Sequence, residues 1–308
     1  MLPRQILFAS ALLILGLAAA ARAQATLSWK HPPGTRAVRT VIGLKQTLTV
    51  GGMALNTSVQ STIDSTSTTA EPGPDGAVRV TEKIDALAAK LTLGGASLDY
   101  DSRKPDAAKP DNPILQGVVD VYRVLVGSAT TTVYKDGRAA GVEGTEKIRA
   151  ALPPGSERYI GKSLDGAHLT KEANRELDRL PGKPVSVGDR WTRTEPMEVG
   201  GGQVLTFETH YEYLGTVEKE GRTLHRVGIF IGSVTLSIEP GSPLAAQVTA
   251  SDLKIEASSG SFLFDAEAGA VVERTSSTRI TGSLTLSINN MERPATLDLL
   301  IDQQRTTK

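Results

Sequence analysis

Residues 204–214, VLTFETHYEYL, alternate apolar and polar side chains with a period of two. One face carries Leu205, Phe207, Tyr211 and Tyr213, and the other carries Thr206, Glu208, His210 and Glu212. This spacing is typical of a β-strand that buries one face. The same alternation recurs at 44–50, 59–63, 78–84, 227–231, 253–255, 280–288 and 297–301. The chain therefore predicts many strands, and its abundant Thr fits a pleated surface.

Short polar turns separate these strands and indicate how they are connected. Asp136-Gly137 has the form of a two-residue hairpin loop. Gly-Gly at 51–52, Lys-Glu-Gly at 219–221 and Asn-Asn at 289–290 occupy similar positions. Strands that follow one another through such turns pair antiparallel rather than through βαβ units. We therefore predict a mainly β (α+β) protein with a large curved antiparallel sheet or half-barrel.

Two or three short helices are expected in the middle of the chain. Asn112 and Pro113 begin the first, at 113–126, as a cap and a first helical residue. A weaker helix is expected at 144–152 and a third at 170–180. The third has an apolar stripe formed by Leu169, Ala173, Leu177 and Leu180. The first helix either plugs the groove of the curved sheet or completes its core.

Composition excludes several classes of chemistry. The chain has 308 residues, with 34 Lys and Arg against 34 Asp and Glu. A nucleic-acid-binding protein normally carries a basic stripe, so this balance argues against one. Cysteine is absent, which excludes disulfides, thiolate metal sites and thiol nucleophiles. Aromatic residues make up 4% of the chain, so large ring-lined pockets are scarce.

The first residues have the character of an export signal. Arg4 precedes an almost wholly apolar run at 6–21, and small residues follow it. A run of about 15 residues is typical of a secretory signal and is shorter than the ~20 residues of a membrane span. We predict a signal peptide at 1–23, cleaved after Ala23 or Ala25, with an uncleaved anchor as the alternative. The mature protein is then expected to be soluble and periplasmic or extracellular. No transmembrane segment follows the signal in the sequence, and without cysteine no lipid anchor is expected.

The mature chain divides into two β-rich halves. The N-terminal half is 24–160 and contains the first helix. The C-terminal half is 161–308 and opens with the third helix and the segment 184–191. Each half places an aromatic residue before an acidic turn, at 133–137 and at 263–269. This similarity leaves open whether the halves are a structural repeat and whether they form one continuous sheet.

The segment 180–191, LPGKPVSVGDRW, leads from a helix into a strand. Its structural residues are Pro184, Val185, Val187, Gly188, Asp189 and Trp191. Pro184 favours extended backbone before it, and the two valines are expected on one face. Gly188 permits a positive φ, Asp189 can accept backbone N–H groups in a turn, and Trp191 buries its ring. We interpret the segment as a structural connection, with a ligand contact at Trp191 as the alternative.

The same residues resemble a segment, Pro-Val-x-Val-Gly-Asp-x-Trp, of an uncharacterised family of exported bacterial β-rich proteins. A later turn with Phe264, Asp265 and Gly269 belongs to the resemblance. It covers the C-terminal half well and the N-terminal half only in architecture. The resemblance implies an exported protein whose fold is similar in outline to the half-barrels of periplasmic lipoprotein carriers. It implies no reaction.

Motifs for catalysis or metal binding are sparse. Glu208, His210 and Glu212 project from one strand face and are weak candidates for a divalent cation. A solvated strand produces the same row without a metal, so we assign no metal, no cofactor and no catalytic residue. The two carboxylates lie ~13 Å apart at about 3.3 Å per residue, beyond the separation of about 5 Å in retaining glycosidases. The nearest phosphate-loop pattern, at 155–163, has one residue too many between its glycines. We expect no enzymatic activity.

The groove of the curved sheet is the remaining candidate site, and we predict that it binds an apolar small molecule or lipid. The expected lining residues are Leu205, Phe207, Tyr211, Val227, Ile229 and Phe230 from strands, and Leu115 and Tyr122 from the first helix. Two alternatives stay open. One is an envelope structural or interaction module with a filled core and an unidentified protein partner. The other is a hydrolase of unrecognised type, which a cluster of buried carboxylates would mark.

Overall fold

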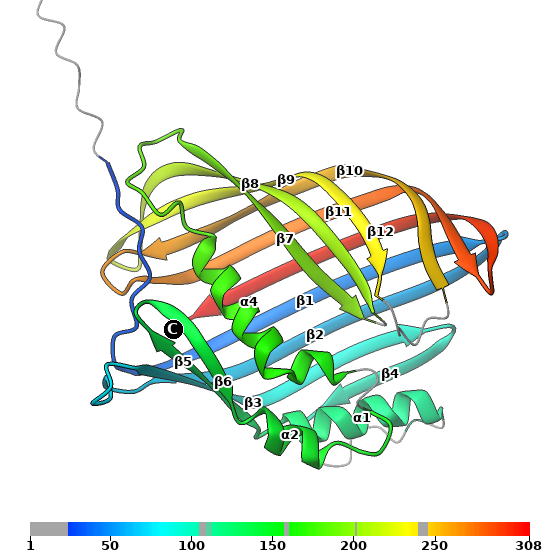
Figure 1. Cartoon of the computed structure of the whole chain (residues 1–308), viewed down its shortest axis with the longest axis horizontal. Helices are drawn as coiled ribbons and strands as arrows, with labels where there is room; N and C mark the ends of the chain where they lie inside the picture. The colour runs from blue at the N-terminus through cyan, green and yellow to red at the C-terminus, as the bar shows by residue number, and fades with distance from the viewer. Residues whose placement is uncertain (1–23, 105–109, 111, 157–159, 201, 240–245) are drawn as a thin grey trace, which may run out of the picture.

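The structure, a computed structural model, describes residues 24–104, 110, 112–156, 160–200, 202–239 and 246–308. Within these ranges, twelve strands form one open antiparallel sheet (Figure 1). The predicted mainly β class with a large antiparallel sheet is therefore confirmed. The signal peptide predicted at 1–23 lies outside the described residues.

The sheet consists of two runs of neighbouring strands. The N-terminal run is β1 (Gly34–Val50), β2 (Met53–Thr69), β3 (Val78–Leu93), β4 (Ala96–Asp101), β5 (Ala129–Lys135) and β6 (Arg138–Glu143). The C-terminal run is β7 (Arg190–Gly200), β8 (Gln203–Lys219), β9 (Arg222–Ile238), β10 (Ala246–Asp265), β11 (Ala270–Ile288) and β12 (Met291–Thr307). In space the order is β6-β5-β3-β2-β1-β12-β11-β10-β9-β8-β7, and β4 pairs with β3.

The first and last strands join the two runs. β1 and β12 pair antiparallel, from Val38 opposite Thr307 to Val50 opposite Ala295. The two halves distinguished in the sequence therefore share one continuous sheet. The mid-chain strands β6 and β7 form its two edges.

Two-residue loops connect β1 to β2, β3 to β4, β5 to β6, β8 to β9 and β11 to β12. At Asp136-Gly137, between β5 and β6, both residues have positive φ, 51° and 75°. Asn289-Asn290, between β11 and β12, has φ values of 51° and 60°. Positive φ at both positions is the geometry of a type I′ turn, whose twist matches that of the flanking strands. The hairpins predicted at these positions are confirmed.

The helices of the described residues lie on one face of the sheet (Figure 1). They are α1 (Pro113–Leu125), α2 (Thr145–Ala151), the short 3₁₀ helix η1 (Lys162–Leu164) and α4 (Gly166–Asp178). The side chain of Asn112 caps α1 by accepting the N–H of Ile114 at 2.9 Å. Leu115 and Val119 pack α1 on β3 and β4, so this helix does not plug the groove. α4 crosses the groove instead.

α4 begins four residues earlier than the expected helix at 170–180. The carboxylate of Asp165 accepts the N–H of His168 at 2.7 Å and caps the helix there. The helix itself contributes no fully buried side chain. Its stripe residues Leu169 and Ala173 line a cavity instead of filling the core.

Contacts from the C-terminal half of α4 and the residue after it fasten the helix to both edges of the sheet. The Asn174 carboxamide bonds both backbone groups of Ala139 on β6, at 3.0 Å each. Just after the helix, Arg179 donates to Glu195 on β7 at 2.9 Å. α4 therefore lies across the open side of the sheet, between β6 and β7 (Figure 1).

Apolar side chains gather in two clusters near opposite ends of the C-terminal strands. The larger cluster comprises Leu205, Phe207, Val234, Leu236, Ile280, Leu284, Leu286, Ala295, Leu297, Leu299 and Ile301. The smaller cluster comprises Leu27, Leu180, Val185, Tyr211, Tyr213, Val227, Ile229, Phe262 and Phe264. Because side chains of β8 pack with side chains of β12, the C-terminal run curls over the middle of the sheet (Figure 1).

The segment 184–191 forms a turn rather than a continuous strand. Val185 is 1% exposed, whereas Val187 is 56% exposed, so the two valines do not share a face as expected. Gly188 has a φ of 91°, and Asp189 accepts the N–H of Ser186 at 2.8 Å. This turn interrupts the alternation after Val185, which is why Val187 points to solvent.

Candidate functional site

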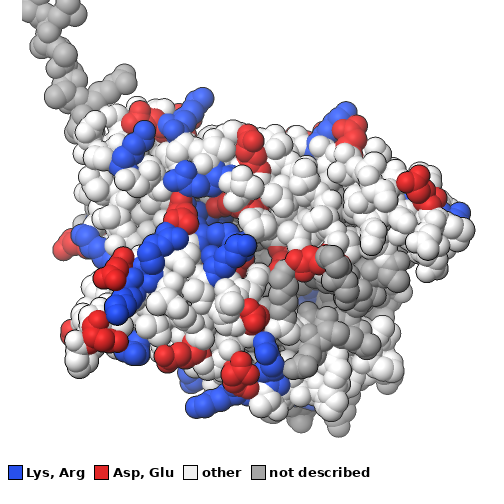
Figure 2. Space-filling view, in the orientation of Figure 1, with Lys and Arg blue, Asp and Glu red and all other residues white. Residues whose placement is uncertain are grey.

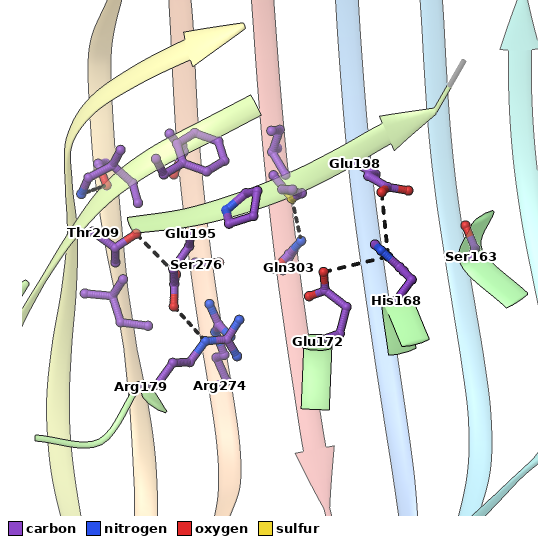
Figure 3. Close-up of a pocket in the computed structure, with 18 residues that line it drawn as sticks. Ser163, His168, Glu172, Arg179, Glu195, Glu198, Thr209, Arg274, Ser276 and Gln303 are labelled. Atoms are coloured by element: carbon purple, nitrogen blue, oxygen red, sulfur yellow. Dashed lines mark hydrogen bonds and ion pairs between the residues drawn. The ribbon is translucent and has the colours of Figure 1, made fainter. Parts of the chain in front are cut away.

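A cavity of about 340 Å³ lies between α4 and the strands that curl over it (Figure 3). This volume falls within the range of about 300–1,000 Å³ that is usual for small-molecule sites. Apolar lining comes from Met197, Phe207, Ile229, Ile231 and Ile301. Polar lining includes His168, Glu172, Arg179, Glu195, Arg274 and Gln303. The cavity thus has an aliphatic wall and a charged wall.

A second cavity of about 580 Å³ adjoins the first beneath α4. The two cavities share Glu172, Arg179, Arg274 and Gln303 as lining. The charged lining of the second cavity is Lys30, Arg36, Arg179, Arg274 and Arg305 against Glu82, Glu172 and Glu176. The second cavity therefore has a basic excess, and Arg274 is one of the four residues where it meets the first.

The outer side of this region is charged as well. Lys and Arg side chains gather beside α4, with Asp and Glu among them (Figure 2). Arg138 on β6 pairs there with Asp178 at the end of the helix. This cation on the edge strand is thus paired with an acid of the helix.

Arg179 is the centre of the charged network in the cavity wall. Its Nε donates to Glu195 Oε1 at 2.9 Å, and its Nη1 pairs with Glu176. The Tyr211 hydroxyl donates to the same Glu195 oxygen at 2.7 Å, and the Thr209 hydroxyl donates to the other at 3.2 Å. Both oxygens of Glu195 are therefore satisfied by this protein's own side chains.

Side chains from other elements hold the last turn of α4 in place. The indole N–H of Trp29 donates to the Leu177 carbonyl at 3.1 Å, and that of Trp191 donates to the Arg179 carbonyl at 2.7 Å. Arg193 donates to the carbonyls of residues 178 and 180. The last carbonyls of a helix lack intrahelical partners, and a cation near them is favourable. These contacts position the Arg179 side chain over the sheet.

His168 lies between two acids near the start of α4. Its Nε2 is 3.7 Å from Glu172 Oε1 and 3.6 Å from Glu198 Oε1 (Figure 3). Glu172 also pairs with Arg175 at 2.6 Å. These acids of the cavity wall therefore face groups that carry, or can carry, a positive charge.

Arg274 on β11 stands beside Arg179 in the same wall (Figure 3). Its Nε is buried without a hydrogen-bond partner, and its guanidinium makes no hydrogen bond or ion pair with any residue the structure describes. Burial and the like charge of Arg179 lower the pKa of Arg274, against the opposite effect of Glu176, Tyr211 and Glu195. Buried polar groups normally have partners, so this side chain is an exception.

The acids beside Arg179 remain ionised at neutral pH. Burial favours the neutral form of Glu195, but the charge of Arg179 and hydrogen bonds from Tyr211 and Arg179 hold its pKa below the usual value. The pKa of Glu176 is also lowered, because the charges of Arg179, Arg274 and Arg305 outweigh its burial. Burial and the charge of Glu195 raise the pKa of Tyr211. The network is therefore a set of charged pairs with a neutral phenol.

The structure distributes the predicted lining residues over several places. Phe207 and Ile229 line the first cavity. Leu205, Tyr211 and Val227 lie in the apolar clusters without any exposed surface. Phe230 is 44% exposed, because a residue next to the inward-facing Ile229 must point to the other face of the strand. Leu115 and Tyr122 belong to a separate cluster between α1, β3 and β4, away from the cavity.

The row of Glu208, His210 and Glu212 is divided between different partners. His210 Nε2 lies 3.2 Å from Glu208 Oε1, and its Nδ1 lies 2.9 Å from the hydroxyl of Thr192. Glu212 pairs with Arg190 at 2.9 Å. Among the residues that the structure describes, no group of three or more His, Asp or Glu has the arrangement of a metal site.

Sequence reasoning missed the polar residues of the cavity wall. Thr209 is 1% exposed, and it shares a face with Phe207 and Tyr211. Arg274 lies an even number of residues before the fully buried Ile280 on β11. The signal that could have found them is the same period of two, applied to polar residues in phase with buried ones.

Comparison with known protein families and with curated proteins returned no match. Among solved structures, a lipovitellin described for its lipid–protein interactions is 9% identical with a TM-score of 0.41; the match covers 91% of this chain and 25% of that chain. The chain thus spans about a quarter of that protein's length.

OccK11 (OpdR) of Pseudomonas aeruginosa is 8% identical with a TM-score of 0.22, over 93% of this chain and 100% of that chain. The translocator domain of the autotransporter NalP from Neisseria meningitidis is 8% identical with a TM-score of 0.19, over 88% of each chain. Scores at this level carry no argument about this chain.

None of the helices in the described ranges combines the length and apolar character that crossing a bilayer requires.

Proposed function

We propose that this protein is exported and binds an apolar or amphipathic small molecule of the lipid class beneath α4, without converting it chemically. The observation that carries the proposal is the space between α4 and the sheet. The helix crosses the groove without a fully buried side chain, and two adjoining cavities lie under it. A helix that only completed a core would bury its apolar stripe.

The chemistry of the wall favours binding over hydrolysis. A general acid that works near neutral pH needs a raised pKa. The cavity acids Glu195 and Glu176 instead have lowered pKa values, because both lie against Arg179. Glu195 also accepts hydrogen bonds on both oxygens. These acids are suited to holding the wall together, which supports a binding function.

The adjoining cavities also weigh against a module with a filled interior. Protein interiors are normally packed with few voids larger than a water molecule. The first cavity leaves about 340 Å³ open beside the largest apolar cluster. A ligand can therefore bind in this space, against the apolar side chains.

A matched pair of substitutions on β11 tests this function. Ser276 lines the first cavity, and the adjacent Ser277 points to the other face. Ser276→Phe is expected to fill the cavity, whereas Ser277→Phe adds the same ring outside it. Binding is measured on the full chain with the neutral fluorescent probe N-phenyl-1-naphthylamine, and native mass spectrometry of protein from a bacterial periplasm reports any ligand that copurifies.

The expected result is probe binding by the wild type and by Ser277→Phe, with a loss of about tenfold or more for Ser276→Phe. Thermal unfolding of both variants checks that they are folded. The proposal is wrong if the wild type binds neither the probe nor a copurifying molecule, or if both variants lose binding equally while remaining folded.

A further inference from the structure

Among the charged residues that line both cavities, Arg274 is the one with a buried hydrogen-bond donor that no described residue satisfies. Glu195 is held by Arg179, Tyr211 and Thr209. Arg305, which lines the second cavity, lies 3.9 Å from Glu82. The guanidinium of Arg274 has no such partner among the described residues. An arginine carries five N–H donors and no acceptor, so only an anion or a neutral acceptor from outside can satisfy it.

The position of Arg274 is as informative as its lack of partners. It lines both cavities, at the place where they meet. On one side lies the basic excess of the second cavity, which includes Arg36 and Arg305. On the other side lies the aliphatic wall of the first cavity, with Ile231 and Ile301. A molecule that spans this boundary therefore meets cations at one end and hydrocarbon at the other.

We propose that Arg274, next to Arg179, anchors the acidic headgroup of a single-chain amphipathic ligand, a carboxylate or phosphate, while the acyl chain lies along Phe207, Ile231 and Ile301. This inference rests on the proposed ligand-binding function and names its ligand class. A guanidinium binds carboxylates and phosphates through two parallel N–H donors, which a point charge cannot do. Arg179 already pairs with Glu176 and Glu195. It therefore contributes positive charge near the headgroup, and Arg274 contributes the hydrogen-bond donors.

A purely structural role for Arg274 makes a different prediction about stability. In that role the guanidinium balances Glu176 and Glu195, and its removal leaves charges uncompensated and lowers the melting temperature. In the anchoring role, the charged form of Arg274 is destabilised while the site is empty, because the side chain is buried beside Arg179. The lowered pKa of Arg274 agrees with this. Arg274→Met, which keeps an unbranched apolar side chain and removes the charge, is then expected to retain or raise the melting temperature of the empty protein.

The binding test compares two ligands that share a sixteen-carbon chain and differ in the headgroup. Palmitate carries a carboxylate and hexadecanol a hydroxyl, and each displaces N-phenyl-1-naphthylamine from the full chain below its critical micelle concentration. We expect the wild type to prefer palmitate by about 10- to 100-fold, the equivalent of one charge-assisted hydrogen bond or two. Arg274→Met should abolish the preference for palmitate and leave hexadecanol binding unchanged. Arg274→Lys, which keeps the charge, should retain part of the preference.

Arg279→Met is the matched control. Arg279 lies on the same strand, an odd number of residues away, and pairs with Asp298 at 2.9 Å on the opposite face. It is expected to keep the full preference for palmitate. Inorganic phosphate is added as a further probe, and we expect it to compete with palmitate and not with hexadecanol.

The outcomes separate this inference from the proposed function. If palmitate and hexadecanol displace the probe equally, with no effect of Arg274→Met, the headgroup site is overturned while lipid binding stands. If neither displaces the probe but phosphate binds and requires Arg274, the site takes a free anion and the amphipathic ligand is overturned. If nothing binds, both the inference and the proposed function fail.

Discussion

The Nε of Arg179 donates to Glu195 Oε1 at 2.9 Å, and this contact joins the end of α4 to the edge strand β7. At the opposite edge, Asn174 bonds the backbone of Ala139 on β6. Because β6 and β7 do not pair with each other, α4 is the element that connects them. The cavities beneath α4 therefore depend on side-chain contacts at two places.

Glu195→Gln is expected to lower the free energy of unfolding by about 1.5–3 kcal/mol, the usual contribution of hydrogen bonds to a charged group. The substitution removes the charge that faces Arg179 and leaves that cation only Glu176. Urea denaturation at neutral pH measures the effect. Glu212→Gln is the control, because Glu212 pairs with the 74% exposed side chain of Arg190, and such surface pairs contribute about 0–1 kcal/mol. Equal losses in the two variants would contradict a special role for Glu195.

Asn174→Ala is expected to release α4 from β6. Its carboxamide satisfies the N–H and the carbonyl of Ala139, which lies on an edge strand. Loss of both bonds should cost about 1–3 kcal/mol and speed the amide exchange of α4 more than that of β1. Lys171→Ala, an exposed substitution on the same helix, is the control. Unchanged exchange rates in α4 after Asn174→Ala would show that this contact does not hold the helix.

Acid is expected to weaken the protein in part through Glu195. Its pKa is lowered in the folded state by Arg179 and Tyr211, against the effect of burial, so the unfolded chain binds the proton more tightly. The stabilisation is complete above the unfolded pKa of about 4.3 and is lost as the pH falls through the folded value. The free energy of unfolding should therefore fall more steeply below about pH 4.3 in the wild type than in Glu195→Gln. Parallel slopes in urea titrations across this range would contradict the assignment.

Trp191 is expected to stabilise the protein through both its ring and its N–H group. The ring stacks on Tyr211 with centroids 5.6 Å apart, and the N–H donates to the Arg179 carbonyl. Trp191→Phe keeps the stacking and should cost about 1 kcal/mol, whereas Trp191→Ala should cost about 3–5 kcal/mol. Thermal unfolding measures both. A loss in Trp191→Phe as large as that in Trp191→Ala would assign the whole effect to the hydrogen bond.

Signal cleavage is expected after Ala23 rather than after Ala25. The N–H of Ala25 donates to the Val185 carbonyl at 2.8 Å, and the Val185 N–H donates back at 2.9 Å. Cleavage after Ala25 would remove this bridge next to the fully buried Val185. The intact mass of protein exported to a bacterial periplasm should therefore correspond to a chain that begins at Gln24. A mass that begins at residue 26 would contradict the expectation.

The strands and their connections were largely predictable from the sequence, because both are determined by near neighbours in the chain. The period of two at 204–214 fixes the buried face of β8, and Asp136-Gly137 determines its hairpin through local backbone preferences. The pairing of β1 with β12 has no local signal, since their residues lie more than two hundred positions apart. Sequence alone therefore predicted an antiparallel sheet but left its order and continuity open.

The site was less predictable, because its residues come from elements that only the complete fold brings together. Phe207 and Ile229 were found as apolar residues in phase with their strands. Arg179, Glu195 and Arg274 were missed, since a charged residue on a strand or helix end normally faces solvent. Of the two roles left open for the first helix, completing the core is the one observed, because α1 packs on β3 and β4. The helix between the two edges of the sheet is α4, and its sequence has no local signal for that position.

The pairing of the first strand with the last determines when this protein can fold. β1 lies in the middle of the sheet, yet one of its two neighbours, β12, follows it more than two hundred residues later in the chain. Until β12 has paired with it, β1 presents an unpaired edge that other chains can join. Contacts of such long sequence separation also form slowly. A change that prevents β12 from pairing with β1 should therefore cause aggregation rather than a local defect.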